Sequence, residues 1–255
     1  MLSHIILVLA CAAVVSSQPS DNHEWKAPEM GQVRSPCPGL NTLANHGYIS
    51  RSGKGITIAE IMEGAVAGFN VANTSILQAA KVGLLSGSAF DTMDLDALAL
   101  HNLVEHDASI SRQDWALGDN LNFNETLFSV MANINPESDF YSPETAAQVQ
   151  KMRLDDSIAR NPSVTNTDKE FQLRCRESAL YLSIFGNTTT GVAPKQFVNI
   201  FFRDERLPIE EGWKRSEVLI TPDTMHPMQT FIFHNSNWTQ TQACEPLVLG
   251  SGIVI

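Results

Sequence analysis

The chain has 255 residues, 43% of them apolar, and its formal net charge at pH 7 is −11. This length can bury one large core or two small ones, and the apolar content is ordinary for a globular protein. The acidic balance argues against nucleic acid or an anionic membrane surface as a partner, because like charges repel. It fits a soluble, acid-tolerant secreted protein.

The N-terminus carries a continuous apolar run over residues 5–15, followed by two serines. The run is too short for a membrane span and predicts a secretory signal peptide over residues 1–17, although no Lys or Arg precedes it. The mature domain would then be 18–255, with no second long apolar run. Four sequons for N-glycosylation also favour secretion. Their acceptors are Asn73, Asn124, Asn187 and Asn237.

Periodicity and capping signals predict a mostly α-helical chain. The first helix follows Pro38 and ends near Gly47, and the second begins at Thr57, which has the capping-box spacing to Glu60. Further helices are predicted over 73–85, from 124, over 143–159, over 168–185 and from 193 to about 207. After residue 213 the chain is proline-rich and polar, with short runs such as 230–233 that resemble strands. We therefore expect one mostly α domain with an irregular C-terminal tail.

The cysteine count leaves one thiol over in an oxidising compartment. Cys11 leaves with the signal peptide, and three cysteines remain. The simplest partition pairs Cys175 with Cys244 and leaves Cys37 as a working thiolate. Alternatively, Cys37 pairs with one of the other two or with a second chain.

Cys37 lies between Pro36 and Pro38, at the start of the first predicted helix. The residue before a proline is excluded from helical geometry, and proline suits the first helical position, so Cys37 is expected at the N-cap. A sulfur there faces free N–H groups and the positive end of the helix dipole, which lowers the pKa of a thiol. On these grounds the thiolate could be a nucleophile, a metal ligand or half of a disulfide.

A second segment, Glu105-His106-Asp107, places three ionisable groups directly after an apolar pair. Ser109 follows Glu105 by four residues. Together with backbone carbonyls, these side chains would offer the hard oxygen ligands that Mg²⁺ takes. A solvated polar turn explains the same residues.

A third candidate is Glu177, on the apolar stripe of the helix predicted over 168–185. A carboxylate there would be desolvated, and its pKa would rise toward general acid–base use. The alternative is an ion pair with Arg174 or Arg176 at the edge of the stripe. Cys175 would point to roughly the opposite face, where it is free to form the predicted disulfide.

Two motifs carry a resemblance to a known family. The first is Ser35 to Tyr48, with Pro-Cys-Pro-Gly-Leu-Asn near its start, and the second is Glu105 to Arg112, which reads Glu-His-Asp-Ala-Ser-Ile-Ser-Arg. The chain resembles the fungal haem-thiolate peroxidases, which include chloroperoxidase and the unspecific peroxygenases. His106, where the long class has glycine, resembles the short peroxygenase class.

The resemblance implies a compact helical domain enclosing haem b, with Cys37 as the proximal iron ligand. It implies that Glu105, the His106 carbonyl and Ser109 hold Mg²⁺, or alternatively Mn²⁺, against a haem propionate. Glu177 would be the distal acid–base residue, supported by the His106 side chain.

The implied activity is that of an unspecific peroxygenase, which uses H₂O₂ to insert oxygen into C–H and C=C bonds. Its substrates would be small apolar or aromatic molecules, with one-electron peroxidase side activity and no reductase partner, since peroxide brings oxygen and oxidising equivalents together. Leu180, one turn beyond Glu177, is a candidate for the channel wall, although core packing explains it equally.

Three other functions stay open from the sequence. Halogenation of the chloroperoxidase type would use the same scaffold. A cysteine hydrolase would use Cys37 and His106 without haem. A non-catalytic secreted glycoprotein would hold Cys37 in a disulfide.

Overall fold

Most helices begin where the sequence supplies a capping group. In the computed structural model, which describes residues 23–238, a side-chain oxygen at several N-caps accepts a backbone N–H of the first turn. These capping residues are Thr57, Asn124, Ser142, Thr167 and Thr221. The predicted signal peptide and Cys244 lie outside the described residues.

Eight α-helices form the described part of the chain, with four two-residue strands and three short 3₁₀ turns. The helices are α1 (Pro38–Asn45), α2 (Ile58–Phe69), α3 (Asn73–Gly83), α4 (Glu125–Ala132), α5 (Pro143–Arg160), α6 (Asp168–Phe185), α7 (Lys195–Asp204) and α8 (Pro222–Asn235). The strands pair antiparallel, β1 (Ile56–Thr57) with β2 (Thr92–Met93) and β3 (Phe140–Tyr141) with β4 (Ala193–Pro194). The 3₁₀ turns are η1 (Leu84–Ser86), η2 (Leu95–Ala99) and η3 (Trp115–Leu117).

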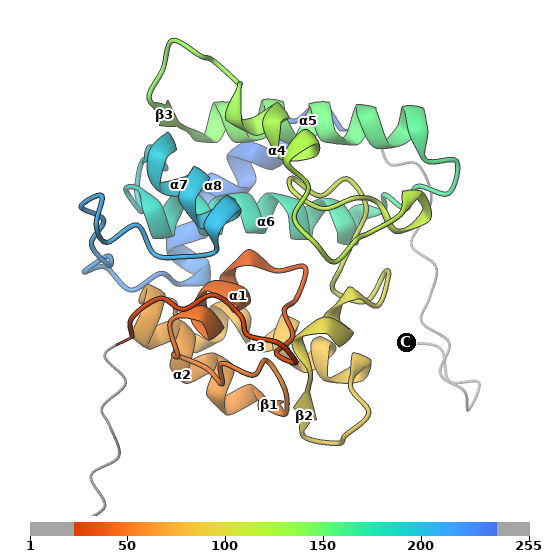
Figure 1. The fold of residues 1–255 in the computed structure, drawn as a ribbon. Coiled ribbons are helices and arrows are strands. Elements are labelled where there is room, and N and C mark those ends of the chain that lie inside the picture. The colour runs from red at the N-terminus through yellow and green to blue at the C-terminus, as the bar shows by residue number, and fades with distance from the viewer. Residues whose placement is uncertain (1–22, 239–255) are drawn as a thin grey trace, which may run out of the picture.

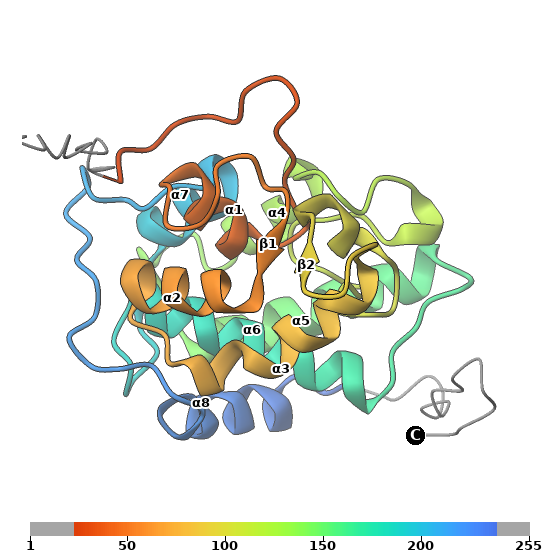
Figure 2. The same ribbon diagram turned by 90° about the horizontal axis from the view of Figure 1, so that it is seen from below.

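Helix α6 runs through the middle of the molecule (Figure 1) and packs against α5, α7 and α8. In the same view α1, α2, α3 and the β1–β2 pair lie below it, and α4 and α5 lie above. The view from below places α2 and α3 across that face, with α8 along one edge (Figure 2). A side chain on α6 can therefore reach both halves of the molecule.

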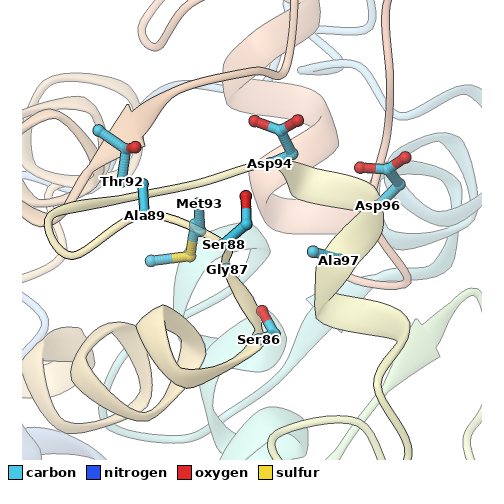
Figure 3. Close-up of a pocket in the computed structure, with 9 residues that line it drawn as sticks. All are labelled: Ser86, Gly87, Ser88, Ala89, Thr92, Met93, Asp94, Asp96 and Ala97. Atoms are coloured by element: carbon cyan, nitrogen blue, oxygen red, sulfur yellow. The ribbon is translucent and has the colours of Figure 1, made fainter.

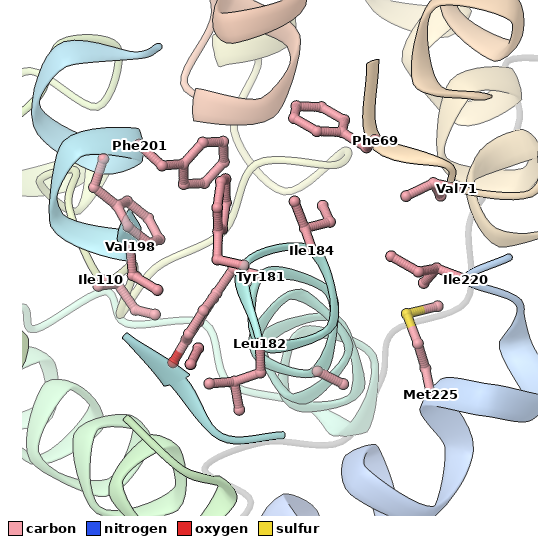
Figure 4. Close-up of a cluster of buried hydrophobic side chains, with 14 of the residues drawn as sticks. Phe69, Val71, Ile110, Tyr181, Leu182, Ile184, Val198, Phe201, Ile220 and Met225 are labelled. Atoms are coloured by element: carbon pink, nitrogen blue, oxygen red, sulfur yellow. The ribbon is translucent and has the colours of Figure 1, made fainter. Parts of the chain in front are cut away.

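The hydrophobic core surrounds the C-terminal half of α6 (Figure 4). Phe201 of α7 packs its ring against Phe69 of α2 and against Phe185 of α6, with centroid separations of 6.4 and 4.7 Å. Aromatic pairs at such distances add to the free energy of burial. These rings join α2, α6 and α7 around one core, and the prediction of a single, mostly α domain is confirmed.

The structure corrects the prediction of strand-like runs and irregular chain after residue 213, because residues 222–235 form helix α8. Thr221 and Thr224 cap it reciprocally, and Pro222 occupies its first turn. Residues 230–233 favour strands by local propensity, but Met225, Met228 and Ile232 share a helical face that is buried. Burial of that face outweighs the local preference. No helix in the described part of the chain is long and apolar enough to cross a membrane.

Candidate active site

Cys37 is the N-cap of α1, with extended backbone angles and Pro38 directly after it, as predicted. Ser35 fixes the loop from the other side, because its Oγ accepts the Cys37 N–H at 3.1 Å. Asn41, one turn into α1, accepts the Ser35 N–H at 2.7 Å and donates to the Ser35 carbonyl at 2.8 Å. The cysteine loop is thereby held to its own helix.

The Cys37 thiol keeps an accessible surface, yet burial among the surrounding atoms raises its pKa. The backbone N–H groups of Leu40 and Gly39 act in the opposite direction, as predicted for a helix N-terminus, and the charge of Glu177 adds to the rise. The net shift corrects the prediction of a thiolate stabilised by the helix alone. Since a bound metal ion deprotonates a coordinating thiol, this environment suits a metal ligand better than a free nucleophile.

A second set of contacts clamps the same loop from α7. Glu205 Oε1 accepts from Asn41 Nδ2 at 2.8 Å and from Arg112 Nη2 at 2.7 Å. Arg112 is buried, so the Arg112–Glu205 ion pair lies in the interior next to the loop that holds Cys37. Asn41 and Arg112 lie in the two motifs of the sequence, but nothing in the sequence singles out Glu205 as their partner.

His106 and Glu177 meet, as the resemblance implied. The distance from His106 Nε2 to Glu177 Oε2 is 3.2 Å, and His106 Nδ1 lies 2.9 Å from the Asp107 carbonyl. Burial opposes a charge on His106, but the Glu177 carboxylate and the Asp107 carbonyl outweigh it and raise the pKa of the imidazole. In the protonated form both ring nitrogens donate, which matches two oxygen partners.

The Glu177 side chain is 54% exposed with respect to the protein's own atoms, and the predicted desolvation of its carboxylate beside the implied haem stays a prediction. Its neighbours on the same face of α6, Leu173 and Leu180, are only partly buried. The alternative prediction, an ion pair of Glu177 with Arg174 or Arg176, is wrong. Arg174 bonds to Asn166 and Arg176 to the Ser75 carbonyl, while Glu177 pairs with His106.

Of the oxygen atoms that were expected to hold a cation, the Ser109 hydroxyl and the His106 carbonyl lie together, whereas the Glu105 carboxylate contacts His101. Ser109 Oγ donates to the His106 carbonyl at 3.0 Å, and Glu105 Oε2 lies 2.7 Å from Nδ1 of His101. Glu105 Oε1 is buried without a hydrogen-bond partner among the described residues. No group of three or more His, Cys, Asp or Glu side chains within residues 23–238 is positioned to hold a metal ion. The predicted cation ligands differ from such a group, because they are one carboxylate, one backbone carbonyl and one hydroxyl.

The remaining predicted residues lie apart from this group. Cys175 is fully buried on α6, and burial raises its pKa to about 12. Its predicted partner Cys244 lies outside the described residues, so the disulfide stays a prediction. Leu180 lies one turn beyond Glu177, and its role also stays a prediction.

A separate cavity of about 320 Å³ lies beside η1, β2 and η2 (Figure 3). Its lining includes the carboxylates of Asp94 and Asp96 and the hydroxyls of Ser86, Ser88 and Thr92. Asp94 is already used, because it accepts the Gly55 N–H at 2.8 Å. None of the residues around Cys37 or Glu177 lines this cavity.

Sequence comparison decides which family this arrangement represents. A family model described as "Peroxidase, family 2" matches residues 23–218. The chain belongs to this peroxidase family. It is 32% identical over 218 residues to an aromatic peroxygenase of Coprinellus radians, covering 76% of this chain and 83% of that protein. It is 30% identical over 209 residues to an aromatic peroxygenase of Cyclocybe aegerita, covering 73% of this chain and 56% of that protein.

A chloroperoxidase of Leptoxyphium fumago is 31% identical over 134 residues, which cover 46% of this chain and 36% of that protein. Membership of peroxidase family 2 confirms the predicted resemblance and the predicted class of oxidoreductase, a haem-thiolate peroxidase or peroxygenase. It contradicts the cysteine-hydrolase and non-catalytic alternatives. One contact agrees with the family, because His106 pairs with Glu177 rather than with Cys37.

The family implies a haem, and the residues present fit one. Cys37 offers an accessible sulfur at a helix start, and thiolate sulfur is an established axial ligand of haem iron. Position 39 is glycine, where a Cβ would lie 3.6 Å from Cys37 Sγ, so the space beside the sulfur stays clear. Glu177 presents an exposed carboxylate that acts electrostatically on the same sulfur.

Proposed function

We propose that the protein is a secreted peroxygenase that uses H₂O₂ to transfer oxygen to aromatic and other apolar molecules. One-electron oxidation of phenols would be its side activity. The observation that carries the proposal is the His106–Glu177 pair at 3.2 Å, whose carboxylate stays accessible and acts on the Cys37 thiol. The longer matches to aromatic peroxygenases than to chloroperoxidase favour oxygen transfer over halogenation.

A haem bound through Cys37 supplies the peroxide-dependent oxidation chemistry. Glu177 would accept the proton of the peroxide at a carboxylate oxygen and return it to the departing oxygen, so that water leaves. His106 would orient that carboxylate through Nε2, while the Asp107 carbonyl fixes the ring through Nδ1. Leu180 would contribute an apolar wall beside Glu177.

The cation site is part of the proposal. Glu105, the His106 carbonyl and Ser109 would hold Mg²⁺, or alternatively Mn²⁺. Support comes from the buried, unpartnered Glu105 Oε1 and from the closeness of the Ser109 hydroxyl to the His106 carbonyl. A hard divalent cation would supply the opposite charge that this buried carboxylate oxygen otherwise lacks.

Secretion is proposed from the N-terminal apolar run and the four sequons. Asn73, Asn187 and Asn237 are exposed, and Asn124 is partly buried at the N-cap of α4. Asn187 uses its Oδ1 to accept two backbone N–H groups of the following turn, which leaves its amide nitrogen available for a glycan. The Cys175–Cys244 disulfide would form in the same oxidising compartment.

The test is Glu177→Gln in the haem-loaded protein, compared with Glu63→Gln on the exposed side of α2. Both variants should keep the red-shifted Soret band of a ferrous–CO thiolate complex. Turnover of an aromatic substrate with H₂O₂ should fall about 100-fold or more in Glu177→Gln only. Unchanged turnover would refute the role of Glu177, and a histidine-type Soret band in the wild type would refute the thiolate ligand.

A further inference from the structure

Trp115 presents an aromatic face to solvent next to the proposed cation site. It starts η3 and is 57% exposed. Its indole stacks on the ring of His101, with ring centroids 5.3 Å apart and an interplanar angle of 13°. Tryptophan side chains are large and apolar, and they are usually mostly buried or used in recognition. The exposure of Trp115 therefore requires an explanation.

Direct contacts lead from Trp115 toward the interior. His101 Nδ1 lies 2.7 Å from Glu105 Oε2, and its Nε2 lies 3.8 Å from Asp107 Oδ2. Glu105 and Asp107 flank His106, which bonds to Glu177. Two aromatic rings and one hydrogen bond thus join solvent to the segment that carries the acid–base pair.

The backbone around Trp115 is anchored in the core. Asp114, directly before it, is buried and accepts the Ala108 N–H at 2.9 Å and the Ser157 hydroxyl at 3.1 Å. This anchoring fixes the indole relative to α5.

We propose that Trp115 is a surface oxidation site, at which phenols attached to large polymers give up single electrons without entering the protein. This inference rests on the proposed peroxide-dependent function. It adds a substrate class, bulky phenolic polymers, that an interior binding site excludes by size.

The step balances with H₂O₂ as the oxidant. One H₂O₂ takes up two electrons and two protons and forms two waters. Trp115 supplies each electron inward through His101 and loses its indole proton to solvent. A phenol at the surface then returns one electron and one proton to the indole and leaves as a phenoxyl radical, so two phenols are oxidised for each peroxide.

The test compares Trp115→Phe, which keeps a stacking ring that is much harder to oxidise, with Trp25→Phe. Trp25 is also exposed, at 39%, and has no ring stack within the described residues. Each haem-loaded variant receives H₂O₂ with either free phenol or phenol coupled to dextran. The ratio of polymer oxidation to free-phenol oxidation should fall about tenfold or more in Trp115→Phe and stay unchanged in Trp25→Phe.

A spectroscopic measurement accompanies the kinetics. Mixing with H₂O₂ without a donor should give a tryptophan radical by electron paramagnetic resonance, narrowed by ring deuteration, in the wild type and Trp25→Phe but not in Trp115→Phe. An unchanged ratio together with an unchanged radical overturns the inference. Failure of the proposed function is different, because the wild type would then oxidise neither phenol.

Discussion

Glu205 shows how a single side chain completes the site. Its backbone is left-handed, with φ of 48°, a conformation that costs a non-glycine residue about 1 kcal/mol or more. Its carboxylate binds Asn41 and Arg112, and its carbonyl accepts from Asn45 Nδ2 at 3.1 Å. These three contacts offset the strain and hold the helix that begins at Cys37.

We therefore expect Glu205→Gln to lower the free energy of unfolding by about 3 kcal/mol, because it leaves the buried Arg112 without its counter-charge. The matched control is Glu125→Gln, which breaks the half-exposed pair with Arg203 at 2.6 Å and should cost about 1 kcal/mol at most. Urea unfolding measures both. Equal losses in the two variants would contradict the clamp.

Glu170 stabilises the start of α6 in a pH-dependent way. Burial opposes its charge, but hydrogen bonds from the Thr167 hydroxyl and backbone N–H and from Lys169 lower the pKa of Glu170 to about 2. A lowered pKa means that its contribution is complete above the ordinary value of 4.5 and is lost as the pH falls toward 2.

At a pH near the lowered pKa of Glu170, Glu170→Gln should therefore have the same free energy of unfolding as the wild type. At a pH above the ordinary pKa, the variant should be less stable by about 3 kcal/mol. Urea unfolding across that pH range measures the difference. Two curves that run parallel throughout would show that the carboxylate does not carry this part of the stability.

At the scale of the element, α8 is a helix that contains a proline. Pro227 lies inside it, is exposed and cannot donate the backbone hydrogen bond of that turn. Pro222 is also exposed but lies in the first turn, where no such bond is lost. The two prolines therefore differ only in their position along one helix.

Pro227→Ala should raise the free energy of unfolding by up to about 3 kcal/mol, since alanine restores the missing bond without losing buried contacts. Pro222→Ala should give no gain. Thermal unfolding of the two variants tests this difference, and an equal effect would mean that α8 does not contribute to the cooperative unfolding transition.

The sequence predicted the elements whose signals are local. Capping residues such as Thr167 and the proline after Cys37 act within one turn, and the bounds of α6 were correct to the residue. Helix α8 was missed because its helical face is recognised only when buried against neighbours. Glu205 was missed because its partners are far away in the chain, and the exposure of Glu177 depends on how α6 is placed among the other helices.

At the scale of the whole molecule, His46 ties distant parts of the chain together. Its Nδ1 lies 2.6 Å from the His23 carbonyl in the N-terminal arm, and its Nε2 accepts the Leu207 N–H at 3.0 Å. An acceptor at Nε2 requires the neutral ring. Burial, opposed by the bond to the His23 carbonyl, lowers the pKa of His46 below its ordinary value of 6.5.

The lowered pKa means that His46 contributes its full stability above the ordinary value and loses it as the pH falls through the folded value. The melting temperature of the wild type should therefore fall on mild acidification. His46→Gln should have a lower melting temperature at neutral pH, and that temperature should fall less on acidification. Thermal unfolding at a series of pH values measures this. The same pH dependence in both proteins would assign the acid sensitivity to another group.

The clamp on the cysteine loop also has a consequence for synthesis. Asn41 and Glu205 are 164 residues apart, and Arg112 and Glu205 are 93 apart. On the ribosome the cysteine is made early, but the carboxylate that fixes its helix emerges only after α7. The Cys37 thiol is therefore present during most of translation without these contacts. Its loop reaches its final geometry only after residue 205 has been added.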